Sequence, residues 1–290
     1  MDKKTFNFGV LLLVVATFFL AATIEFAHGS KVLGIIFTFI LIITLSKIKI
    51  GSKIKADINT GDKRNKLYAV AGVLIIISVL VYNYTIKDSI GTMDMMAFLL
   101  GSSIFACSIK DFKVRKFGIF GAYMSFTFIV LYAILYSMFD NYLYKYNYYF
   151  VLIPSVNIAK AMGISLVIDS SDVVRIFGIE KNLGLDVGST CNGINSMFLL
   201  VSVVIGFSFS ENFLEIKKTL LLAIIALLVA YLANIMRVVV LFFVAYRYGL
   251  ELMMTVHAHA GWIIFAVNST IFLYILNRLM EYRFTKVSPK

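Results

Sequence analysis

The stretch "TLLLAIIALLVAYLANIMRVVVLFFVAY", residues 219–246, contains a single charged residue, Arg237. An apolar run of this length fits a membrane-spanning helix, since about 20 apolar residues cross the hydrocarbon core of a bilayer. The rest of the chain has the same character, because 60% of its 290 residues are hydrophobic and the mean hydropathy is +0.90. This composition excludes an ordinary water-soluble domain and predicts an all-α integral membrane protein.

Apolar runs of similar length recur along the chain and predict about eight transmembrane helices. These runs are residues 8–26, 31–46, 67–84, 92–109, 117–139, 191–209, 219–246 and 260–279.

The basic residues give this membrane model an orientation, because short cytoplasmic loops collect Lys and Arg. With the amino terminus inside, the predicted inner segments hold 19 of the 27 Lys and Arg residues. We therefore expect a multi-pass protein of the cell membrane with both termini in the cytoplasm. The net charge of +11 is then explained by contact with anionic lipids, and nothing beyond the charge supports a nucleic-acid partner.

The chain is expected to form one membrane domain with two functional regions. Residues 1–139 predict a scaffold of five spans with no chemical motif. Residues 140–290 predict an outer loop followed by a three-span catalytic region. The outer loop, residues 140–190, contains a tyrosine-rich stretch that suits an interfacial helix and then short runs typical of irregular or strand-like structure.

Cys191 begins the sixth predicted span, where Ser189 and Thr190 are good helix-capping residues. The amino terminus of a helix favours a thiolate, so this thiol is a candidate nucleophile. Cys107 lies inside an apolar run and is interpreted as a small apolar residue.

Two further polar features are expected at the same outer depth of the membrane. Asn234 and Arg237 are three residues apart and hence on one helical face, and an arginine inside a span indicates a function by default. His257 and His259 lie at the outer entry of the last span. Alone, each feature has a structural explanation, such as an arginine that reaches the headgroups, but their shared side and depth favour one site.

Three short motifs follow one another along the chain: Cys-x-Gly, then Asn-x-x-Arg, then His followed four residues later by Gly and an aromatic residue. This order resembles the exosortase/archaeosortase family of membrane-embedded cysteine transpeptidases. The matching pieces are Cys191-Asn192-Gly193, Asn234 to Arg237, and His257 to Gly261-Trp262. The resemblance covers mainly residues 150–280, and the first five spans agree with it only in being hydrophobic.

The resemblance implies that the partners are exported proteins that end in a recognition motif, a transmembrane helix and a basic cluster. Cys191 would attack a backbone carbonyl to form a thioester, His257 would act as acid and base, and Arg237 would stabilise the oxyanion. No cofactor is implied, and one thiol with two histidines is a poor set of metal ligands.

Four residues are expected to line or support this site. Asn234 is a candidate to hold the guanidinium of Arg237, and Asn195 lies one turn from Cys191. Gly193 allows either close approach of a substrate strand or helix packing. His259 would not face Cys191 together with His257, because residues 257 and 259 are about 200° apart on a helix, so it would face lipid headgroups or support the loop.

Two other accounts stay open from the residues alone. A transporter or channel could use the same arginine and histidines for anion binding and proton relay, although no paired broken helices are seen. An intramembrane protease or acyltransferase could use the same thiol without joining the product to an acceptor.

Overall fold

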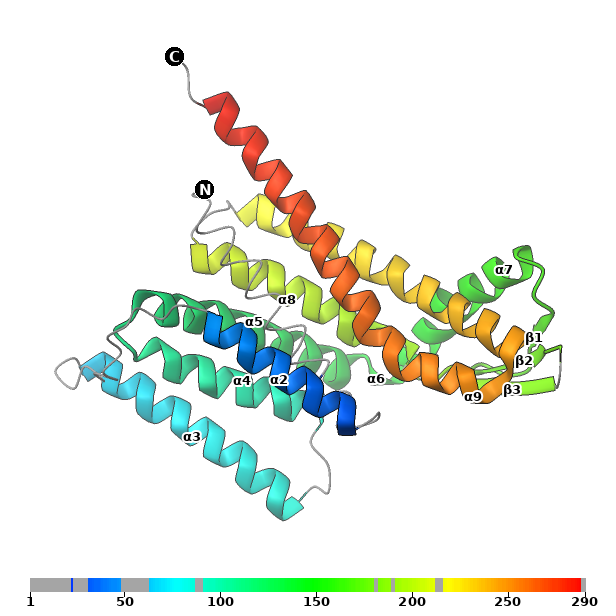
Figure 1. Ribbon diagram of the computed structural model, residues 1–290, viewed down its shortest axis with the longest axis horizontal. Coiled ribbons are helices and arrows are strands. Elements are labelled where there is room, and N and C mark those ends of the chain that lie inside the picture. Colours follow the sequence, from blue (N-terminus) through cyan, green and yellow to red (C-terminus); the bar gives the residue numbers. More distant parts are fainter. Residues whose placement is uncertain are drawn as a thin grey trace. The chain divides into compact units, whose positions relative to one another are not determined.

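The computed structural model describes residues 22, 31–47, 63–86, 91–179, 182–188, 191–211 and 216–287, and these are mostly helical (Figure 1). The helices are α2 (Lys31–Lys47), α3 (Lys63–Ile86), α4 (Thr92–Cys107), α5 (Phe112–Met138), α6 (Asp140–Tyr146), the π-helix η1 (Asn147–Leu152), α7 (Ile153–Ala161), α8 (Ile194–Glu211) and α9 (Ile216–Val287). The strands are β1 (Leu166–Ile168), β2 (Val173–Phe177) and β3 (Asn182–Asp186).

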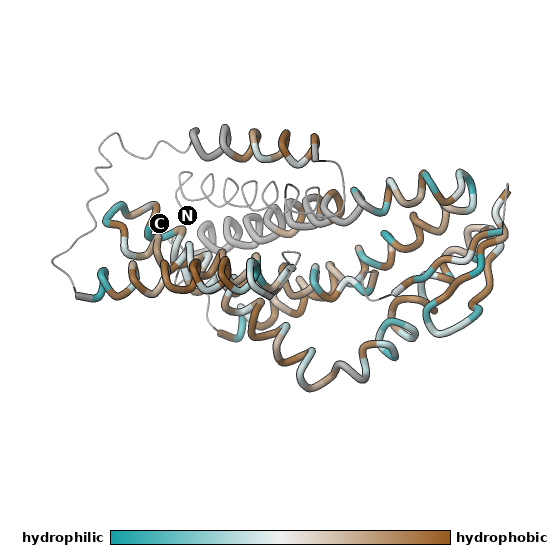
Figure 2. Tube along the Cα trace, turned by 90° about the horizontal axis from the view of Figure 1, so that it is seen from below, coloured by the Kyte–Doolittle hydropathy of each residue, from teal (hydrophilic) through white to brown (hydrophobic). Residues whose placement is uncertain are grey.

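Three of the described helices are long and apolar enough to cross a membrane. They are α3, α5 and α9, and their candidate spans are Arg64–Thr85, Val114–Met138 and Ile216–His257. The helices α2, α4 and α8 are also apolar, but their apolar segments are shorter. Apolar residues run along most of the described helices, with hydrophilic positions near several ends (Figure 2). The chain is therefore a mostly helical membrane protein, as expected, with three candidate spans among the described residues; the predicted span 8–26 falls outside them except for Ala22.

The last two predicted spans form one helical run. Two separate spans were expected at 219–246 and 260–279, but α9 runs through both and is interrupted only at Gly249, which has φ 82° and ψ −176°. Most residues on either side of this glycine are good helix formers and none is a proline, so the helix resumes at once. In Figure 1 the two parts of α9 meet at a sharp bend close to the small sheet.

The chain divides into two compact units that alternate along the sequence. One unit consists of residues 1–45, 139–196 and 228–290, and the other of residues 46–138 and 197–227. The separation of a scaffold, 1–139, from a catalytic region, 140–290, stays a prediction.

Glycines bring the helices of the second unit close together. A Cβ on Gly72 of α3 would lie 2.6 Å from the carbonyl oxygen of Gly101 of α4, and a Cβ on Gly118 of α5 would lie 2.6 Å from the carbonyl oxygen of Ser103. Small residues allow helix backbones to approach in this way, which is a common basis of helix association in membranes.

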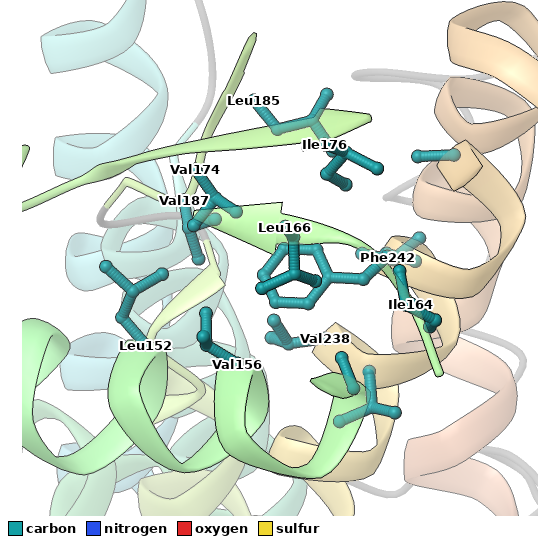
Figure 3. Close-up of a cluster of buried hydrophobic side chains, with 14 of the residues drawn as sticks. Leu152, Val156, Ile164, Leu166, Val174, Ile176, Leu185, Val187, Val238 and Phe242 are labelled. Atoms are coloured by element: carbon teal, nitrogen blue, oxygen red, sulfur yellow. The ribbon is translucent and has the colours of Figure 1, made fainter. Parts of the chain in front are cut away.

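The first unit contains an antiparallel sheet in the order β1-β2-β3, in the segment where irregular or strand-like structure was expected, so the chain is mostly helical and not all-α. One face of the sheet is apolar and buried, whereas the side chains that alternate with it are exposed. Side chains from η1, α7 and α9 cover the buried face (Figure 3). The cluster includes Leu152, Val156, Leu166, Val174, Ile176, Leu185, Val187, Val238 and Phe242. Cys191 belongs to the same buried cluster, so the packed sheet holds the segment that carries the thiol.

Candidate active site

Cys191 lies in a short turn between β3 and α8. Its backbone N–H donates to the carbonyl of Gly188 at 3.0 Å, and its side chain is buried, with 7% of its surface exposed. Ser189 and Thr190, the expected capping residues, lie outside the described residues. The cap that the structure does show is Asn192, whose Oδ1 accepts from the backbone N–H of Ile194 at 3.0 Å. The thiol therefore stands directly before the first turn of α8.

Asn234 fixes the backbone of the nucleophile. Its Nδ2 donates to the carbonyl of Cys191 at 2.9 Å, and its side chain is buried. Gly193 has φ +74°, and a Cβ there would overlap the side chain of Asn234. The Nδ2 of Asn234 thus binds the backbone of Cys191, and the expectation that Asn234 also holds the guanidinium of Arg237 stays a prediction. Of the two roles considered for Gly193, helix packing fits the close approach of Asn234 on α9, and the approach of a substrate strand stays a prediction.

His257 is the histidine that the structure brings to Cys191. Its Nδ1 lies 4.0 Å from Sγ, at the long end of a contact with sulfur. The chain is helical through residues 257 and 259, so the two imidazoles leave the helix axis on different sides. This is the arrangement expected from the 200° separation.

Arg237 completes the group of polar side chains. It lies on α9 before the bend at Gly249, whereas His257 lies after it. Its charge interacts with both Cys191 and His257. The Nε of Arg237 is buried and has no hydrogen-bond partner in the described part of the chain. A buried guanidinium N–H with no partner is costly, and such a group is suited to bind an oxygen atom of a ligand.

Asn195 and His259 are the two remaining candidate residues of the site. Asn195 is on the first turn of α8 and is exposed, unlike Cys191. His259 is half-buried and makes its own contacts. Their expected supporting roles stay predictions.

No pattern in the sequence indicated the role of η1. Asn147 in this π-helix is buried, and its Nδ2 donates to the carbonyl of Val187 at 2.5 Å, four residues before the nucleophile. The hydroxyl of Tyr231 on α9 donates to the carbonyl of Phe150 at 2.7 Å. Burial and then the nearby Tyr231 raise the pKa of Tyr146 to about 12, so this phenol stays protonated at neutral pH. The only signal in the sequence was an amide within a tyrosine-rich segment, which does not reveal a partner 40 residues away.

The arrangement has the elements of thiol chemistry on an acyl group. A buried thiol faces an imidazole that can exchange a proton with it, and a guanidinium stands close to both. In the described ranges, no group of three or more His, Cys, Asp or Glu side chains is arranged to hold a metal ion.

These features place the chain among helical membrane proteins that bring a thiol, which precedes one apolar helix, close to an imidazole carried by another. The model of the transmembrane exosortase family (Exosortase_EpsH) matches residues 21–274. This chain therefore belongs to the transmembrane exosortase family, whose members are generally cysteine transpeptidases or proteases that sort exported proteins with C-terminal tails. The comparisons with curated proteins and with solved structures gave no match. The family does not favour the transporter or channel interpretation.

Proposed function

We propose that this chain is a protein-sorting cysteine transpeptidase that removes the C-terminal tail of exported proteins and transfers them to a membrane or surface acceptor. The observation that carries the proposal is the 4.0 Å approach of Nδ1 of His257 to Sγ of Cys191, with Arg237 close enough to interact with both. The substrate would be a protein that ends in a recognition motif, a transmembrane helix and a basic cluster.

The first half of the reaction forms an acyl-enzyme. His257 accepts the thiol proton, and Sγ of Cys191 attacks a backbone carbonyl carbon of the substrate. Arg237 donates hydrogen bonds to the oxyanion of the tetrahedral intermediate, a type of contribution that is about 3–4 kcal/mol for one good donor. The C–N bond breaks as the imidazolium of His257 protonates the departing amine. The exported protein is left as a thioester on Cys191.

The second half releases the product. An acceptor nucleophile loses its proton to His257, attacks the thioester carbonyl, and expels the sulfur of Cys191. A lipid acceptor gives transfer and water gives hydrolysis, and both begin from the same thioester.

In this proposal the protein crosses the cell membrane about eight times. Both termini lie in the cytoplasm and the site opens on the outer face. A substrate tail inserted with its basic cluster inside would then present its motif on the same side as Cys191. The basic inner loops of the enzyme follow the same charge rule as the substrate tail.

The test is co-expression with an exported protein from the same genome that ends in such a tail. We expect tail removal to be lost in Cys191→Ala and His257→Ala, and to be kept in the matched controls Cys107→Ala and His259→Ala. Mass spectrometry of the new C-terminus distinguishes transfer from hydrolysis. Tail removal by Cys191→Ala at the normal rate would refute thiol catalysis, and loss in His259→Ala with normal removal in His257→Ala would reassign the acid and base.

A further inference from the structure

The strand β3 presents a free backbone edge. In the antiparallel pairing of β2 with β3, the N–H of Val187 donates to the carbonyl of Asp172, which marks these two residues as a hydrogen-bonded pair. Because such pairs alternate along a ladder, Leu183 and Leu185 also direct their backbone groups toward β2. The residues between them direct their N–H and C=O groups away from the sheet. These residues are Asn182, Gly184 and Asp186.

This edge is open in the described part of the chain. Asn182, Gly184 and Asp186 are all exposed, and a Cβ added to Gly184 would meet no atom within 4 Å. No hydrogen bond between described residues reaches the outward groups of these three residues. Glycine weakens a strand and in this position satisfies no local geometric need, whereas it does permit close approach of a second backbone. At the opposite side of the sheet, β1 is contacted by α7.

The edge leads directly to the nucleophile. After Asp186 the ladder ends at Val187, and a turn closed by the N–H of Cys191 and the carbonyl of Gly188 follows at once. Leu185, Val187 and Cys191 belong to one buried cluster, so β3 and the thiol are held in a fixed relation. A peptide aligned on β3 would therefore be held a few residues from Sγ.

We propose that the outer edge of β3 binds the recognition segment of the substrate as an added strand. This inference rests on the proposed function, because it gives the peptide whose carbonyl is attacked its place of binding. The occupant is an extended segment of the exported protein, immediately before its transmembrane helix. Backbone hydrogen bonds to Asn182, Gly184 and Asp186 supply affinity for any extended sequence and set the register of the peptide relative to Cys191.

The main test removes one outward donor without removing a bond between β2 and β3. In Gly184→Pro the lost N–H is the one that faces away from the sheet, a position in which edge strands tolerate proline. We expect about tenfold slower tail removal, because one or two backbone hydrogen bonds to the substrate are lost. The variant Gly184→Ala keeps the N–H and should slow tail removal less than Gly184→Pro does, so the difference between the two variants measures the effect of the lost donor. Thermal unfolding and the alkylation rate of Cys191 verify that each variant is folded around its site.

A second measurement decides the matter even if Gly184→Pro fails to fold. A photoreactive amino acid is placed at Asn182 on the proposed edge, or at Val167 on the same exposed face of β1, in a Cys191→Ala background. We expect a cross-link to the co-expressed tailed protein from position 182 and none from position 167. Equal cross-linking from both positions, or none from 182, would overturn the proposal.

The two proposals fail in different ways. Tail removal by Cys191→Ala at the normal rate would refute the proposed function. Tail removal that depends on Cys191 but is unaffected by Gly184→Pro would refute only the proposed role of β3.

Discussion

At the scale of single residues, Cys191 is held by amides as much as by packing. The backbone carbonyl of Cys191 accepts from Asn234, and the carbonyl of Val187 accepts from Asn147. These amides come from two separate helices, α9 and η1, and both are buried. Buried hydrogen bonds of this kind define a unique backbone position, because loss of one partner leaves the other unsatisfied at a cost of about 1–3 kcal/mol.

Gly193 provides a prediction at this scale. The structure contains a matched control, because Gly163 has a similar φ of +84° with open space at its Cβ position. We expect Gly163→Ala to cost about 1 kcal/mol of unfolding free energy, from the positive φ alone. Gly193→Ala should cost about 1–3 kcal/mol more, because its new methyl group overlaps the side chain of Asn234. Thermal unfolding of the detergent-solubilised protein measures both.

The overlap can be isolated with a double variant. Asn234→Ala removes the atoms that the methyl group at position 193 would meet. The loss of unfolding free energy in the double variant should therefore be smaller than the sum of the losses in the two single variants, by about 0.5–3 kcal/mol. Losses that simply add would contradict the packing assigned to this pair.

At the scale of elements, the bend in α9 decides where the imidazole lies. Gly249 has φ 82° and ψ −176°, a backbone region that is almost exclusive to glycine. Arg237 comes before this residue and His257 after it, so the break sets the direction in which the second helical segment returns. In a straight helix, about 20 residues would separate these two side chains by about 30 Å.

We therefore predict that Gly249→Ala disturbs the placement of residue 257 relative to Cys191. The measurement uses His257→Cys in a Cys107→Ala background and the short cross-linker dibromobimane, which fluoresces when both of its arms react. The Gly249→Ala variant should give a several-fold lower fluorescence yield, because an alanine there costs about 1–3 kcal/mol in the bent conformation. Gly163→Ala is the control for a positive-φ glycine outside α9, and an unchanged yield in Gly249→Ala would show that the bend does not depend on glycine.

At the scale of the whole molecule, the charge distribution predicts which parts face each side of the membrane. The turn that contains Ser170 belongs to the predicted outer segment, and Phe112 lies in the predicted inner loop 110–116; both residues are exposed. In a chain without its native cysteines, Ser170→Cys should react with a membrane-impermeant thiol reagent in intact cells. Phe112→Cys should react only after permeabilisation. The reverse pattern would invert the orientation and place the site on the cytoplasmic face.

Much of the site was predictable because its signals are local. The apolar runs identified the long described helices, since burial in lipid requires hydrophobic residues along the full length of a span. A cysteine before a span and an arginine within one are visible without any knowledge of contacts. Gly249 lies in the gap between the predicted spans 219–246 and 260–279, but the sequence did not show that the helix breaks at this one residue, because a single glycine between helix formers has the same composition as a loop residue or a helix interior.

Hydropathy and charge are properties of consecutive residues, so the order of amino acids was enough to establish the class of protein, its apolar helices and the residue types available for chemistry. The folded chain was needed to show which of these groups meet. The amide of Asn234 donates to the carbonyl of Cys191, His257 approaches the thiol, and β3 leads into the turn that carries Cys191. These contacts join residues up to 66 positions apart, and they depend on backbone angles and packing that no local pattern encodes.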